Sequence, residues 1–175
     1  MDEAIRQAAI DALERVREKI IANIDAAGLK ASGRTQASME VQPYDTGVRL
    51  VGRPYFQGLE IGRPAGRTPR NFDEIIKQWI IDKGLQVTPI PYKTDRQHKY
   101  TVEERSLQSM AGAIAHNIRL RGFEPWRNGG RAPSPQRDVY TPVIEEEVPT
   151  ITDQLASIIA NIIVNEYSPN TGLRK

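Results

Sequence analysis

The sequence contains no cysteine, only two histidines and no long hydrophobic run. The missing cysteines exclude disulfides, thiolate metal ligands and cysteine nucleophiles. No segment approaches the roughly 18 apolar residues that a membrane-spanning helix needs, so we expect no membrane partner. The segment Met1–Ala4 is acidic, whereas a secretory signal begins with basic residues and continues with apolar ones. We therefore expect a protein that works where it is made, or that leaves the cell only inside something larger.

Motifs for catalysis and cofactor binding are also missing. His98 lies in a polar segment, and His116 stands beside the apolar stripe of a predicted helix, without a metal-ligand spacing around either. No glycine-rich phosphate loop and no Gly-x-Ser-x-Gly turn occurs. The acidic run 145–147 has two interpretations, a cation site or, more simply, a solvated face ahead of a helix. We expect no catalytic residue, no metal and no cofactor.

A hydrophobic content of 39% and a charged content of 26% over 175 residues fit one ordinary globular domain. The net charge of +2 is unevenly distributed along the chain. Residues 1–52 carry 7 basic and 8 acidic side chains, residues 53–137 carry 15 and 8, and residues 138–175 carry 2 and 6. A basic middle and an acidic end suit head-to-tail packing of subunits. Merely solvated charged faces are the alternative interpretation.

The first half of the chain predicts a helix followed by a hairpin. Apolar residues recur at steps of three and four over residues 2–27 and form one stripe, which predicts an amphipathic helix. Strands are predicted over 37–42 and 48–53, with Gly47 in the turn available for a positive φ angle. Residues 55–61 follow as a third strand or a short helical turn.

The second half predicts further helices. Two of them are opened by a polar cap with a glutamate three residues later, a spacing that favours reciprocal capping. These pairs are Asn71 with Glu74 and Thr101 with Glu104. A short strand is predicted over 138–144, and Thr150 with Asp153 is expected to cap the last helix. The predicted core comprises Leu13, Val16, Ile20, Met39, Val41, Leu50, Trp79, Ile158 and Ile162.

This order predicts an α+β fold. We expect a single domain over residues 1–167, in which a small antiparallel sheet is packed by a long N-terminal helix and a C-terminal helix, with additional helices inserted. A basic loop and helix region is expected at about residues 85–138, and residues 168–175 are expected to form a flexible tail.

The segment Tyr55–Arg70 is the strongest candidate for a contact surface. It begins with aromatic and apolar residues, and then becomes a loop with two prolines, two glycines and three arginines. Glycine and proline restrict such a loop to few conformations, which lowers the entropic cost of ordering it in a contact. Arginines with interleaved aromatics recur between Arg119 and Arg137. This pattern is typical of protein–protein surfaces and also of nucleic-acid binding. The weak overall charge favours a protein partner.

The layout resembles the tail-completion and head–tail joining (neck) proteins of long-tailed bacteriophages. Matching features are the small-residue loop Ala31–Arg34 before the hairpin, the aromatic–x–x–x–Glu–x–Gly pattern within Tyr55–Gly62, and Val143–Glu146 before the last helix. Lys30 departs from the acidic residue usual in the family, and residues 85–137 are additional. The resemblance implies a non-catalytic structural protein of a phage or prophage, found in the virion and in the host cytoplasm during assembly.

The resemblance also implies partners. These are other virion proteins, either the connector and neck or the tail tube, and further copies of the chain in a ring. Nucleic acid stays a less favoured alternative. The candidate interface residues are Tyr55, Phe56, Glu60, Arg63, Arg67, Arg70, Phe123, Trp126, Arg127 and Arg131.

Overall fold

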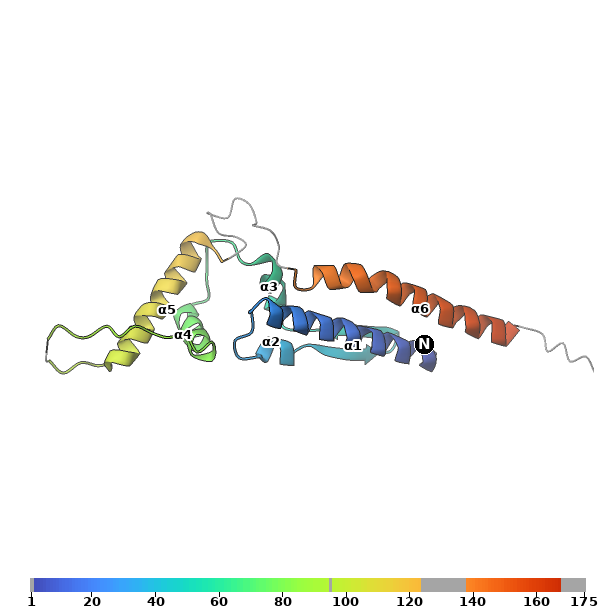
Figure 1. The fold of residues 1–175 in the computed structure, drawn as a ribbon, viewed down its shortest axis with the longest axis horizontal. Helices are drawn as coiled ribbons and strands as arrows, with labels where there is room; N and C mark the ends of the chain where they lie inside the picture. The colour runs from blue at the N-terminus through green and yellow to red at the C-terminus, as the bar shows by residue number, and fades with distance from the viewer. Residues whose placement is uncertain (1, 95, 124–137, 168–175) are drawn as a thin grey trace, which may run out of the picture. The chain divides into compact units, whose positions relative to one another are not determined.

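The computed structural model describes residues 2–94, 96–123 and 138–167 (Figure 1). It confirms the predicted α+β fold with a two-stranded antiparallel sheet and long N-terminal and C-terminal helices. The predicted flexible tail, residues 168–175, lies outside the described residues. The elements are α1 Glu3–Ala26, α2 Arg34–Ala37, β1 Glu40–Tyr44, β2 Gly47–Val51, the 3₁₀-helix η1 Pro54–Phe56, α3 Gln57–Ile61, α4 Phe72–Asp82, α5 Val102–Arg121 and α6 Thr141–Tyr167.

The chain divides into two compact units, although its sequence predicts a single domain. Unit 1 combines residues 1–26, 36–53 and 138–175, and unit 2 combines residues 27–35 and 54–137. Each unit buries its own apolar side chains. The predicted insertion at 85–138 is therefore a structural part of unit 2, because α5 supplies Ala111 and Ala115 to the core of that unit.

In unit 1, α1 packs against both strands of the hairpin through a stripe of buried residues spaced four apart. The register pairs Val41 with Leu50 and Pro43 with Val48, which places these apolar side chains on one face of the sheet. Arg17 of α1 donates to the carbonyl of Met39 at 2.8 Å and fixes the residue that precedes β1. The buried apolar residues of unit 1 are Ala12, Val16, Ile20, Ile24, Met39, Val139 and Val143.

The hairpin turn is tighter than its sequence suggests. Only Asp45 and Thr46 separate the strands, since Tyr44 and Gly47 are already paired. Gly47 does not have the positive φ angle that the sequence predicts for it, so that expectation is wrong. A Cβ atom there would lie 2.6 Å from the hydroxyl oxygen of Tyr44, but the Tyr44 side chain is 48% exposed and can move away, so sterics do not require glycine at this position.

The last helix begins nine residues earlier than its sequence predicts. The expected strand over 138–144 and the expected cap at Thr150 are both wrong, because α6 runs without interruption from Thr141 through Pro149. Pro142 fits the first turn of a helix, where its missing N–H has no partner to lose. Pro149 cannot donate to the carbonyl of Glu145, but Glu145 and Pro149 are exposed, so water can solvate that carbonyl.

In unit 2, α4 and α5 pack against one another around Phe72, Ile76, Ile80, Ala111 and Ala115. Thr101 caps α5 as predicted. Its hydroxyl accepts from the backbone N–H of Glu104 at 3.1 Å, and the Glu104 carboxylate accepts from the backbone N–H of Thr101 at 3.0 Å. Asn71 precedes α4 but makes no side-chain cap, so the second predicted capping pair does not form.

The predicted core is only partly correct. Val16, Ile20 and Met39 are buried, and Trp79 is 36% exposed, because it lies beside the buried stripe of α4 rather than within it. The remaining predicted core residues are half-buried, namely Leu13, Val41, Leu50, Ile158 and Ile162. Among the helices of the described ranges, none is both long enough and apolar enough to cross a membrane.

Candidate interaction surfaces

The loop after α3, residues Gly62–Arg70, is held by backbone bonds to the end of α5. We call it the arginine loop. Arg63 and Phe123 exchange N–H···O bonds of 3.2 and 2.8 Å, as two residues in an antiparallel ladder do. The N–H of Gly66 donates to the carbonyl of Arg119 at 2.9 Å. The structure thus joins two segments that are far apart in sequence and that both carry predicted interface residues.

Gly122 is the residue that makes this junction possible. Its φ angle of 76° is one that other residues rarely adopt. A Cβ atom at this position would lie 2.5 Å from the carbonyl oxygen of Arg63 and 2.9 Å from the nitrogen of Ala65. Both the end of α5 and the approach of the arginine loop therefore require glycine.

Phe72 lies beneath two arginines at the base of the arginine loop. The guanidinium carbon of Arg63 is 5.4 Å from the centroid of the Phe72 ring, and that of Arg119 is 5.9 Å from it. Arg119 also donates to the Thr68 hydroxyl at 3.0 Å and to the Asp73 carboxylate at 2.6 Å. The Arg63 guanidinium donates to the carbonyl of Arg67. Arg63 and Arg119 are thus engaged within unit 2 and stiffen the loop.

The arginine end of unit 2 is the name we give to the exposed side chains of Arg67, Arg70 and Arg121, which remain available to a partner. Two exposed apolar side chains occur in the same segments of the chain, Phe123 and Leu120. Charged groups beside apolar ones are typical of contact surfaces.

Of the predicted interface residues, the structure brings together Arg63, Arg67 and Phe123. Glu60 is a predicted interface residue, but it is 1% exposed, so its carboxylate belongs to the interior of unit 2. Phe56 is half-buried. Trp126, Arg127 and Arg131 lie outside the described residues, as does the side chain of Tyr55. Sequence reasoning missed Phe72, Thr68 and Asp73, because their part in the loop depends on α5, which is distant in sequence.

A second surface lies on α6, which is apolar around more than half of its circumference. Val143, Glu147 and Gln154 mark the side of α6 that meets α1, through burial and through bonds from Lys19 and Arg15. At about 100° per residue, apolar side chains extend from that side over an arc of about 200°. We call the outer part of this arc the open face of α6. It consists of Ile144, Val148, Leu155, Ile159 and Ile163.

The open face is exposed to solvent at four of its five side chains, and α6 has no basic residue beside it. Ile144, Val148, Ile159 and Ile163 are between 42 and 51% exposed. At about 100° per residue, Glu145 falls on the side of α6 that carries Ile163, near the start of the helix. No lysine or arginine occurs anywhere in α6. The open face is therefore an apolar surface with an acidic residue at the start of α6 and no basic residue beside it.

Folding separates the charges of the chain more strongly than the linear sequence does. The segments of unit 1 carry 8 Lys and Arg against 14 Asp and Glu, a net charge of −6. Those of unit 2 carry 16 against 8, a net charge of +8. The open face of α6 thus belongs to an acidic unit and the arginine loop to a basic one.

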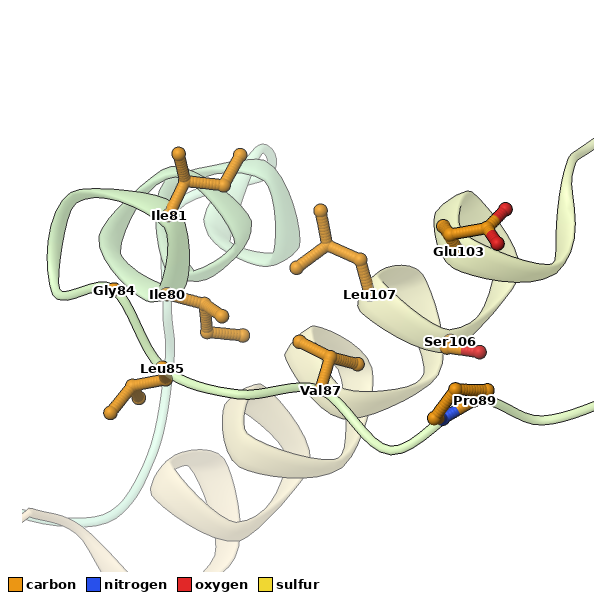
Figure 2. A pocket seen from close by; sticks show the side chains of 9 residues that line it. All are labelled: Ile80, Ile81, Gly84, Leu85, Val87, Pro89, Glu103, Ser106 and Leu107. Carbon is orange, nitrogen blue, oxygen red and sulfur yellow. The ribbon is translucent and has the colours of Figure 1, made fainter.

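Unit 2 also contains an apolar groove of about 280 Å³ between the end of α4, residues 85–89 and the start of α5 (Figure 2). Leu107 and Val87 line it from facing elements, and Glu103 lies at one end. The hydroxyl of Ser106 donates to the carbonyl of Val102 at 2.6 Å and accepts from the N–H of Ile90 at 2.7 Å. Ser106 is therefore engaged with the backbone and is not poised as a nucleophile.

The histidines have ordinary environments. The ring of His98 stacks on Tyr92 at 3.5 Å between centroids, and its Nε2 atom lies 3.0 Å from the carbonyl oxygen of Thr94. His116 is exposed on α5. Over the residues that the structure describes, no three His, Asp or Glu side chains are grouped to hold a metal ion.

Comparison of the chain with protein-family models, with curated proteins and with solved structures finds no match.

Proposed function

We propose that this protein is a non-catalytic structural subunit of a phage virion, which completes the tail or joins head and tail through contacts with copies of itself and with other virion proteins. The observation that carries the proposal is the open face of α6. A helix that packs on one neighbour needs an apolar arc of about 100°, and α6 has about twice that. An exposed apolar surface of this kind is typical of a subunit that is buried in an assembly.

Two further observations support an assembly role. The arginine loop is stiffened by its bonds to α5, so that docking costs little ordering entropy. The order of elements, a long helix, a hairpin, the segment Tyr55–Gly62 and a C-terminal helix, is similar to that of tail-completion and neck proteins. The resemblance supports a role in a phage, and the open face of α6 and the arginine loop support a role in assembly.

Deletion of the gene from the phage or prophage that encodes it tests the proposal. We expect portal, capsid and tail-tube genes to flank it. Without the protein, electron microscopy should show separate heads and tails, or tails of aberrant length, and a plasmid copy should restore joined virions. Intact virions from the deletion strain, together with metabolic or regulatory neighbours, would overturn the proposal.

Nucleic-acid binding is the second candidate, and the observation that favours it is the net charge of +8 in unit 2. A protein with incidental surface charge binds duplex DNA weakly and releases it as the salt concentration rises. We expect this weak behaviour. Binding that persists at physiological salt, and that Arg67→Glu with Arg70→Glu abolishes, would promote this candidate above the first.

A further inference from the structure

We propose that the open face of α6 docks against the arginine end of unit 2 in a second copy of this chain. The inference rests on the proposed function as an assembly subunit and deepens it by naming both halves of the contact. The contact is heterologous, because it joins two different surfaces. Repetition of such a contact generates a ring or a filament.

The open face requires a neighbour that α1 does not provide. Lys19 of α1 reaches Glu146 at 2.9 Å and Glu147 at 2.5 Å, so α1 covers that side of α6. Ile159 and Ile163 point away from it and stay exposed. Full burial of one such side chain contributes about 1.5–3 kcal/mol. The face as a whole can therefore stabilise a contact between subunits.

Charge decides which surface covers the open face. Glu145 borders it, α6 has no basic residue to offset this charge, and unit 1 as a whole carries a net charge of −6. Pairing of α6 with α6 of another copy would join two acidic units, each with a net charge of −6, which is unfavourable. Arg67, Arg70 and Arg121 offer the opposite charge, and exposed Leu120 and Phe123 offer apolar contact. The chain thus carries both complementary surfaces.

Crosslinking of two single-cysteine variants tests the contact directly, because the natural chain has no cysteine. One variant carries Ile163→Cys, and the other carries Pro69→Cys at an exposed position in the arginine loop, which leaves every arginine in place. The purified full-length variants are mixed and treated with a short bismaleimide. Val164→Cys is the matched control, since Val164 is 61% exposed but lies about 100° further around α6.

We expect the mixture of Ile163→Cys with Pro69→Cys to give several-fold more crosslinked dimer than the mixture of Val164→Cys with Pro69→Cys. The excess should fall when salt is raised and when Arg67→Glu and Arg70→Glu are added to the Pro69→Cys chain. Equal yields from the two mixtures would overturn the proposal. So would a dominant dimer from Ile163→Cys alone, because that result would mean pairing of α6 with α6.

Sedimentation of chains without cysteine gives an independent measurement. Ile163→Ser should weaken self-association about 10–100-fold, the equivalent of one buried isoleucine, whereas Val164→Ser should leave it unchanged. Equal effects of the two changes would contradict the proposal, and circular dichroism checks that both variants fold.

This result is separable from the proposed function. A deletion strain that makes unjoined virions, combined with crosslinking that shows no preference for position 163, would leave the virion role standing and remove only the head-to-tail contact. Specific crosslinking combined with intact virions from the deletion strain would leave the head-to-tail contact standing and remove the virion role.

Discussion

At the scale of single residues, the sequence predicts the conformation of a residue better than it predicts which residues lie next to it in space. Gly122 ends α5 with a positive φ angle, as a glycine after a helical stripe suggests. That Arg63 and Ala65 pack against its missing side chain follows only from the fold. Glu60 shows the same limit. The sequence predicts this charged residue at an interface, but in the structure it is 1% exposed.

Substitution of Gly122 tests whether the junction of α5 and the arginine loop contributes to stability. Gly122→Ala forces a positive φ on alanine and places a Cβ atom against backbone, so we expect a loss of about 1–3 kcal/mol in the free energy of unfolding. Gly112→Ala in α5 is the control. It meets nothing within 4 Å, so it should stabilise by about 0.5–1 kcal/mol. Urea unfolding measures both values, and a change of the same sign in the two variants would contradict the expectation.

At the scale of elements, apolar periodicity locates α1 within a residue at each end, because its stripe is continuous and bounded by turns. The same reasoning fails for α6. Pro149 indicates a helix boundary, but it stands at the exposed surface, where the missing hydrogen bond costs less. The predicted core also does not include the open face of α6. The sequence predicts Ile158 and Ile162 in the core, whereas the width of the apolar arc means that α1 alone does not cover it.

Substitution of two threonines tests whether Thr101 caps α5 and whether Thr150 lies inside α6. Thr101 caps α5 in the structure, so Thr101→Ala should cost about 1 kcal/mol. Thr150 lies inside α6, where its hydroxyl is 3.5 Å from the carbonyl of Glu146, so Thr150→Ala should change stability little. Thermal unfolding of the two variants side by side measures the difference. A larger loss for Thr150→Ala would mean that the last helix begins there after all.

The bond between α1 and α6 predicts a pH dependence. Hydrogen bonds to Glu147 and Glu146 raise the pKa of Lys19 above its ordinary value of 10.5. A raised pKa in the folded state means that this stabilisation is fully present below pH 10.5 and is lost as pH rises through the higher pKa. Above that pH, the free energy of unfolding should fall more steeply for the natural chain than for Lys19→Gln. Urea unfolding across an alkaline pH series tests this, and parallel curves for the two proteins would refute it.

At the scale of the whole molecule, local patterns predict an α+β fold but not two units. Hydrophobic patterns show that a residue is buried, and they do not show which other residues share its core. Ile20 and Ile80 look alike in sequence, yet the first lies in unit 1 and the second in unit 2. The charge separation follows from the same partition. Assigning residues 27–35 to the basic unit removes Lys30 and Arg34 from the acidic one.

Two separate cores predict that each unit opens locally without the other. Ile20 is 3% exposed and Ile80 is 1% exposed, and conversion of either to alanine removes the same atoms at a cost of about 2–5 kcal/mol. Ile80→Ala should increase amide hydrogen exchange in α4 and α5 while α1 and the hairpin keep their protection, and Ile20→Ala should do the reverse. Because the two substitutions are chemically identical, each variant is the control for the other. Loss of protection throughout the chain in both variants would mean that the units fold as one cooperative body. Loss confined to the substituted unit would mean that the acidic unit and the basic unit each open without the other.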